Sequence, residues 1–126
     1  MKLLLDTHAF IWAAIEPGRL SARVADLLMD RSNTVLVSAA SAYEIEFKRS
    51  RDEQLMGLPL NLRIAVEMMD FAWLPVGPDH AIAAGRLPRL HGDPFDRILV
   101  AQALSEHAAL VTLDSRLPPY GATTLW

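Results

Sequence analysis

Short apolar runs recur along the chain, and segments with helical patterns separate them. The runs cover residues 2–5, 34–37, 73–76 and 109–112, and a last short run covers 123–125. Continuous apolar runs of this length are typical of strands that are buried on both faces. Strands of this kind form a parallel sheet that needs helices on both sides. The pattern therefore predicts an α/β fold, a three-layer α/β/α sandwich around a central, mostly parallel sheet.

The segments between the runs supply the helices. Leu20, Val24, Leu27 and Leu28 follow the i, i+4, i+7, i+8 spacing, which predicts an amphipathic helix over 21–31 with Ser21 as its N-cap. Further helices are expected over 8–15, 41–49, 61–71, 79–86 (capped by Asp79) and 95–107. The eight prolines are scattered between these segments, which favours one domain over residues 1–126.

Composition excludes several classes of protein. Hydrophobic residues make up 52% of the chain and charged residues 21%, which excludes a disordered protein. The absence of cysteine excludes disulfides, thiolate zinc sites and cysteine nucleophiles. No apolar run is long enough for a signal segment or a membrane span, so we expect a cytoplasmic protein without a membrane partner.

Carboxylates gather at one edge of the expected sheet. Some directly follow a strand, and the others stand at the beginning of a helix. In a parallel α/β sheet these positions share the edge at which ligands bind. Clustered carboxylates repel one another unless cations or raised pKa values relieve the repulsion. Oxygen ligands without cysteine favour Mg²⁺ or Mn²⁺. The acids concerned are Asp6, Glu44, Asp93, Asp96 and Asp114.

Each acid also has a purely structural interpretation. Asp6 and Asp93 can cap helices, Ser41 and Glu44 fit a capping box, and Asp114 fits a turn. Taken singly, these interpretations are as good as the functional one. Their coincidence at one edge favours a metal site, and such sites are typical of phosphodiester hydrolysis.

Four blocks of the sequence carry a family resemblance. They are Met1-Lys-Leu-Leu-Leu-Asp6-Thr7-His8, Ser38-x5-Glu44-Ile45, His91-Gly-Asp-Pro-Phe-Asp-Arg97-Ile-Leu-Val-Ala101-Gln-Ala103 and Leu110-Val-Thr112-Leu-Asp114. In this order, and over essentially the whole chain, they resemble the PIN-domain ribonucleases, most closely the VapC-type toxins of toxin–antitoxin pairs. The resemblance implies a PIN-like fold and a metal-dependent endoribonuclease that cuts cellular RNA, often tRNA or rRNA.

The resemblance also implies roles for individual residues. Asp6, Glu44, Asp96 and Asp114 correspond to the acidic quartet that holds Mg²⁺ or Mn²⁺ and activates a water molecule. The supporting residues are Thr7, Ser38, Asp93, Arg97 and Thr112. Asp93 is either an outer ligand or a helix cap, Thr112 hydrogen-bonds Asp6 or a metal-bound water, and Arg97 contacts RNA phosphate or orders the carboxylates. Such proteins are usually homodimers, and the C-terminal segment of a cognate antitoxin covers their active site.

One departure and three alternatives accompany the resemblance. Residues 49–55 replace the Gly-Lys turn of related toxins, which affects substrate contacts rather than the metal site. A catalytically silent PIN-like binding module remains an alternative. A phosphoryl-receiving domain lacks support, because no Asp follows the second strand and no Lys lies beyond Lys48. A nuclease for structured DNA usually carries larger insertions.

The net charge of −3 argues against a nucleic-acid partner only if all fifteen acids are counted as surface charge. If four of the fifteen acids bind metal, the remaining surface has a charge of +1. Ten of the twelve basic residues are Arg, whose planar guanidinium suits phosphate.

Overall fold

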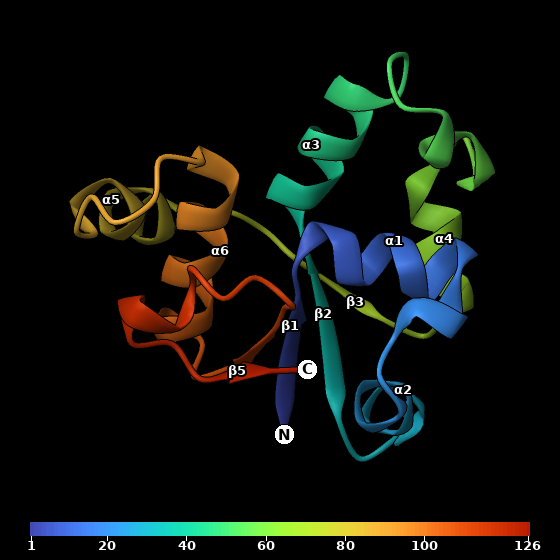
Figure 1. The fold of residues 1–126 in the computed structure, drawn as a ribbon, viewed down its shortest axis with the longest axis horizontal. Coiled ribbons are helices and arrows are strands. Elements are labelled where there is room, and N and C mark those ends of the chain that lie inside the picture. The colour runs from blue at the N-terminus through green and yellow to red at the C-terminus, as the bar shows by residue number, and fades with distance from the viewer.

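The computed structural model describes all 126 residues, as a five-stranded sheet with helices on both faces (Figure 1). The strand order is β3-β2-β1-β4-β5, and every pair of neighbours is parallel. The three-layer α/β/α sandwich is confirmed, and the sheet is parallel throughout rather than mostly parallel. The strands are β1 (Lys2–Leu5), β2 (Thr34–Ser38), β3 (Ala72–Leu74), β4 (Ala109–Val111) and β5 (Thr124–Leu125).

Alternating residues of the central strand β1 serve two separate cores. Leu3 and Leu5 belong to one buried cluster, and Leu4 belongs to the other. Figure 1 shows α1 (Thr7–Ile15), α2 (Ala22–Met29) and α4 (Leu62–Met68) on one side of the sheet, and α5 (Pro78–Arg86) and α6 (Pro94–Ser105) on the other. The strands therefore have no polar face, which explains their continuous apolar sequence.

Helix α3 (Ala39–Lys48) begins two residues before the expected start at residue 41. Ser38 is its N-cap, and the Ser38 hydroxyl accepts a hydrogen bond from the Ala40 N–H at 3.0 Å. The capping box expected at Ser41 and Glu44 is therefore wrong, and Glu44 lies in the second turn rather than the first. The Glu44 carboxylate therefore takes no part in capping α3.

Other boundaries differ by a few residues. Helix α5 is capped at Gly77, whose N–H donates to Nδ1 of His80, so Asp79 is not the cap. Helix α4 ends before residue 71 and α6 before residue 107, because Asp70 and His107 adopt positive φ angles of 59° and 53°. These left-handed residues stop the helices where hydrophobic periodicity alone gave no signal.

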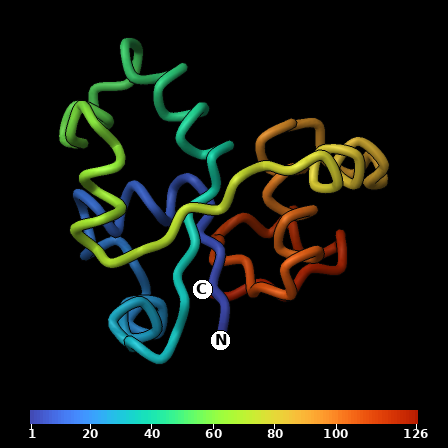
Figure 2. The backbone as a smooth tube through the Cα atoms, turned by 180° about the vertical axis from the view of Figure 1, so that it is seen from behind, coloured from blue at the N-terminus to red at the C-terminus, as the bar shows by residue number.

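Between α3 and α4 the chain forms an arch away from the sheet, which Figure 2 shows from behind. This arch contains the short helix η2 (Glu53–Gly57). Arg49 organises it, since the guanidinium pairs with Glu46 and donates to the carbonyls of Leu55, Leu58 and Pro59. Arg49 is thus bound within the arch and is not available for phosphate.

The remaining short helices are η1 (Pro17–Arg19) and η3 (Pro118–Tyr120). The longest helix, α6, has 12 residues, and none of the helices has the length and apolar character needed to cross a bilayer.

Leu4→Ala should lower the free energy of unfolding by about 3 kcal/mol, because Leu4 is fully buried and the truncated side chain leaves a cavity. Urea denaturation measures the change. Leu60→Ala is the matched control, since Leu60 is 90% exposed, and it should change stability by less than about 0.5 kcal/mol. Equal losses in the two variants would contradict the position of β1 between two cores.

Candidate metal centre

A cavity of about 380 Å³ lies at the carboxyl ends of β1 and β4. All four acids of the expected quartet line it, although they come from four separate parts of the chain. Asp6 directly follows β1, Glu44 lies on α3, Asp96 lies in the first turn of α6, and Asp114 follows β4. The parallel topology thus gathers these side chains as the sequence predicts. The other lining residues are Thr7, His8, Trp12, Lys48, Asp93, Leu113 and Arg116.

Asp6 has both a structural and an electrostatic role in this cavity. It is the N-cap of α1, and its Oδ1 accepts a hydrogen bond from the Ala9 N–H at 2.8 Å. Only 8% of the residue is exposed. Burial raises the pKa of the Asp6 carboxyl, although the Thr112 hydroxyl and the Ala9 N–H oppose the shift. The cap and the metal-ligand interpretations are therefore compatible.

Glu44 is held from two sides. The Thr7 hydroxyl lies 2.7 Å from Oε1, and Nζ of Lys48 donates to Oε2 at 2.6 Å. Ser41 lies 3.0 Å from the Thr7 hydroxyl and completes this buried group. The hydrogen bond to Glu44 raises the pKa of Lys48, so the ammonium stays charged beside the carboxylate. These contacts fix the direction of the Glu44 side chain.

Asp96 and Asp93 lie together at the beginning of α6. Asp93 is the N-cap, as one of its two expected roles required, and its Oδ1 accepts from the Phe95 N–H at 2.9 Å. Asp96 Oδ2 lies 2.8 Å from Nε2 of His91. Burial raises the pKa of Asp96, and nearby Asp93 adds to this shift while His91 opposes it. One potential ligand atom from each of these three residues lies within 4.8 Å of the others.

Asp114 is the most exposed of the four acids in the quartet, and it forms an ion pair with Arg116. The guanidinium Nη2 lies 2.7 Å from Oδ2, and Nε lies 3.0 Å from Oδ1. This hydrogen bonding lowers the pKa of Asp114 and raises that of Arg116. The Thr112 hydroxyl accepts from the Asp114 N–H at 3.0 Å and shapes the turn after β4.

Three supporting residues do not line the cavity, namely Ser38, Arg97 and Thr112. Thr112 instead accepts the hydrogen bond from the Asp114 N–H described above. Ser38 is completely buried as the cap of α3. Arg97 makes no contact with the carboxylates, because its guanidinium donates to carbonyl groups in the last turn of α5 and in the segment between α5 and α6. The expectation that Arg97 orders the acids is therefore wrong, and its planar group is used to hold a loop.

Lys48 and His91 contact two of the acids, Glu44 and Asp96. Lys48 stands four residues after Glu44 on one helix, a spacing that brings opposite charges together. This signal was present in the sequence. His91 stands five residues before Asp96 and reaches it only because the chain turns at the start of α6, which periodicity does not reveal.

The cavity carries an excess of negative charge that suits a divalent cation. Its lining contains five carboxylates but only two permanently cationic groups, those of Lys48 and Arg116. These cations pair with Glu44 and Asp114, which leaves Asp6, Asp93 and Asp96 without a permanently charged partner. Of these, Asp6 is buried and Asp96 is half-buried, and burial raises the pKa of both. An all-oxygen donor set of this kind fits Mg²⁺ or Mn²⁺.

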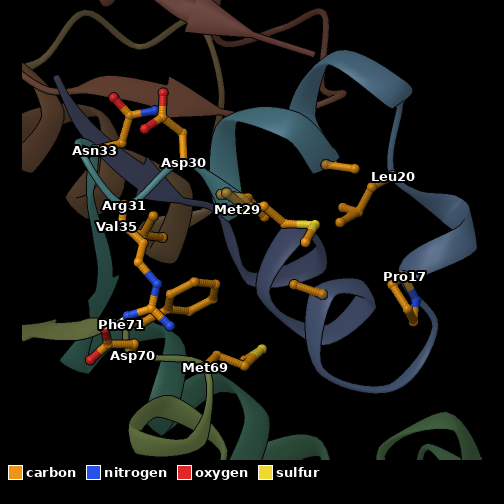
Figure 3. A pocket seen from close by; sticks show the side chains of 13 residues that line it. Pro17, Leu20, Met29, Asp30, Arg31, Asn33, Val35, Met69, Asp70 and Phe71 are labelled. Atoms are coloured by element: carbon orange, nitrogen blue, oxygen red, sulfur yellow. Dashed lines mark hydrogen bonds and ion pairs between the residues drawn. The ribbon is translucent and has the colours of Figure 1, made fainter.

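A second hollow of about 400 Å³ lies at the opposite end of the sheet (Figure 3). It is lined by apolar residues such as Leu20, Met29 and Phe71, which lie near the amino ends of β2 and β3. Arg31 and Asp70 form an exposed ion pair at 3.3 Å beside it. Because it lies away from the carboxyl ends of the strands and holds no acid cluster, it is not the candidate centre.

The fold and the acid-lined cavity define a protein of the PIN-domain class. Residues 3–121 match the family model of the PIN domain, and the chain belongs to this family. Within it, the chain is similar to Ribonuclease VapC22 of Mycobacterium tuberculosis, with 29% identity over 116 residues that span 91% of this chain and 88% of the relative.

Two solved structures share the fold. One is VapBC2 from Rickettsia felis bound to a promoter DNA fragment, with a TM-score of 0.70 and 18% identity over 99% of this chain and 98% of that chain. The other is DNA-bound VapBC from Salmonella typhimurium, with a TM-score of 0.69 and 16% identity over 99% of this chain and 97% of that chain. At this level of identity they establish the architecture.

Asp6→Asn should raise the melting temperature of the metal-free protein at pH 7. The amide keeps the cap of α1 but removes a buried charge, and each kcal/mol gained adds roughly 4 °C. Because the folded-state pKa of Asp6 is raised, the cost of ionising it applies above that pKa and disappears at lower pH. The difference between variant and wild type should therefore shrink as the pH falls towards about 4.

Calorimetry in the presence of a chelator, at several pH values, measures this effect. Asp26→Asn is the control, since Asp26 is exposed on α2 and should leave the melting temperature nearly unchanged. A lower melting temperature for Asp6→Asn at pH 7 would show that the Asp6 charge stabilises the fold.

Proposed function

We propose that the protein is a Mg²⁺- or Mn²⁺-dependent endoribonuclease that acts as the toxin of a type II toxin–antitoxin pair. The observation that carries this proposal is the convergence of four acids from separate elements on one cavity at the sheet edge. The similarity to a protein named Ribonuclease VapC22 supports the activity, and membership of the PIN-domain family supports the site.

In this proposal, Asp6, Asp96 and Asp114 bind the metal, and Glu44 completes the quartet. A bound divalent ion would supply a water of lowered pKa and would stabilise charge on the leaving oxygen. Thr7 and Lys48 orient the Glu44 carboxylate through their hydrogen bonds. Arg116 holds Asp114 at the rim, and its exposed guanidinium faces the solvent from which RNA approaches.

The proposed partners are an RNA substrate, tRNA or rRNA, and a cognate antitoxin that covers the site. The solved VapBC relatives support the second partner. We further propose a homodimer that works in the cytoplasm. Exposed Tyr43 and Phe47 on α3 provide apolar surface of the kind that subunit contacts use.

The alternative is a PIN-like module that binds RNA or a partner without cleaving. All four acids and the cavity are in place, so a silent module would need an arrangement of the ligands that fails to bind metal. Binding and cleavage assays on one RNA separate the two functions.

Purified protein, freed of its antitoxin, should cleave RNA with Mg²⁺ or Mn²⁺, and EDTA should abolish the cleavage. Asp96→Asn should lower the cleavage rate by about 100-fold or more while RNA binding persists, because it removes a ligand that acts in the reaction. Gel analysis of labelled RNA gives both measurements. Asp26→Asn should retain the full rate. Metal-independent cleavage, or RNA binding without any cleavage by the wild type, would overturn the enzymatic function.

A further inference from the structure

A small hollow without apolar lining lies between α5 and α6, next to the acid cavity. Its volume is about 240 Å³, and its lining consists of Gly85, Arg89, His91, Gly92 and Arg97. No carboxylate contributes to the lining. The two glycines leave it open, since a Cβ at either position would meet no atom within 4 Å.

The two arginines of this hollow have no acidic partner. Arg97 binds four backbone carbonyls, those of Ala84, Leu87, Pro88 and His91, and no carboxylate. Arg89 is exposed and makes no ion pair, in contrast to Arg49 and Arg116, which bind acids. Uncompensated guanidinium groups in a concave surface attract anions, and phosphate in particular.

The segment that forms the hollow is already held in place. Arg97 ties the chain between α5 and α6 through the carbonyls named above, and the Tyr120 hydroxyl donates to the His91 carbonyl at 3.2 Å. A ligand that enters this hollow therefore needs little ordering of the protein, which favours binding.

His91 connects the hollow to the acid cavity. It lines the hollow, while its Nε2 lies 2.8 Å from Oδ2 of Asp96, one of the proposed metal ligands. Gly92 also lines the hollow and is followed directly by Asp93, which lines the cavity. The hollow and the acid cavity are therefore neighbours at the beginning of α6.

We propose that this hollow binds a phosphate of the RNA backbone next to the phosphate that is cleaved. The proposal rests on the function proposed above, since it assigns a further contact to the same substrate. The exposed guanidinium of Arg89 contacts the phosphate, and Arg97, which is held by its carbonyl partners, supplies a fixed positive charge. Phosphate contacts place a strand without reading its bases, so the hollow contributes affinity and register rather than sequence preference.

The test uses the full-length protein with one labelled RNA, first for binding by the cleavage-deficient Asp96→Asn protein and then for cleavage by the active protein. Arg89→Gln should weaken RNA binding by about fivefold and reduce the slope of log K against log salt by roughly 0.7, the value for one phosphate contact on a single strand. In the active protein KM should rise by a similar factor with kcat unchanged, because the contact exists before and during the reaction.

Gly85→Glu and Gly85→Gln form a matched pair that leaves the arginines in place. Both side chains start in open space, and only the glutamate brings a negative charge into the hollow. Gly85→Glu should weaken RNA binding several times more than Gly85→Gln. Arg23→Gln on α2 removes an exposed, unpaired arginine elsewhere and should have little effect.

A single methylphosphonate in the RNA locates the contact. At the correct position this neutral linkage should weaken binding to the wild type and abolish the further loss caused by Arg89→Gln.

If the active protein cleaves RNA but Arg89→Gln and Gly85→Glu leave binding and KM unchanged, the hollow is not a phosphate site and the proposed function stands. If the substitutions weaken only the complex with the antitoxin, the hollow belongs to that partner and this proposal is overturned. RNA binding that depends on Arg89 without cleavage by the wild type would overturn the proposed function alone, and absence of RNA binding would overturn both.

Discussion

Burial of carboxylates that converge at one edge of the sheet is the constraint on which the site depends. Two of the acids, Glu44 and Asp114, are neutralised by Lys48 and Arg116. Asp6 and Asp96 have no such partner, and burial raises the pKa of each. A protein that keeps acids in this state loses stability at neutral pH unless a bound cation compensates for the buried negative charge. Two acids with cationic partners and two acids with raised pKa values form an arrangement that suits a divalent ion.

The fold supplies this arrangement through parallel strands and helix caps. Because β1 and β4 are adjacent and parallel, Asp6 and Asp114 follow their strands at the same edge. Asp6 and Asp93 also cap α1 and α6, so the backbone N–H groups of these helices contribute positive potential beside the acids. The structural and functional interpretations of these residues are therefore complementary. The cap hydrogen bond fixes the direction of each side chain, and each side chain also lines the acid cavity.

Much of this was predictable from the sequence, and the parts that were not have identifiable physical reasons. Apolar runs and helical spacing were sufficient for the layers and the strand edges, and hence for the convergence of Asp6, Glu44, Asp96 and Asp114. The start of α3 was not predictable from the sequence, because Ser38 and Ser41 are both capable of capping a helix, and in the structure Ser38 is the cap. The role of Arg97 was not predictable, because three of its four carbonyl partners lie in the loop after α5, whose path has no sequence signal. The contact of His91 with Asp96 also depends on that loop.

The central claim is that the acid cavity binds a divalent cation through Asp6 and Asp96. Anomalous scattering from protein crystals soaked in MnCl₂ tests it most directly. The account predicts an anomalous peak in contact with carboxylate oxygens of Asp6 and Asp96, with Asp114 near it, and loss of this peak when MgCl₂ is in large excess. Manganese bound elsewhere on the surface, with no peak in this cavity at saturating concentration, would contradict the account.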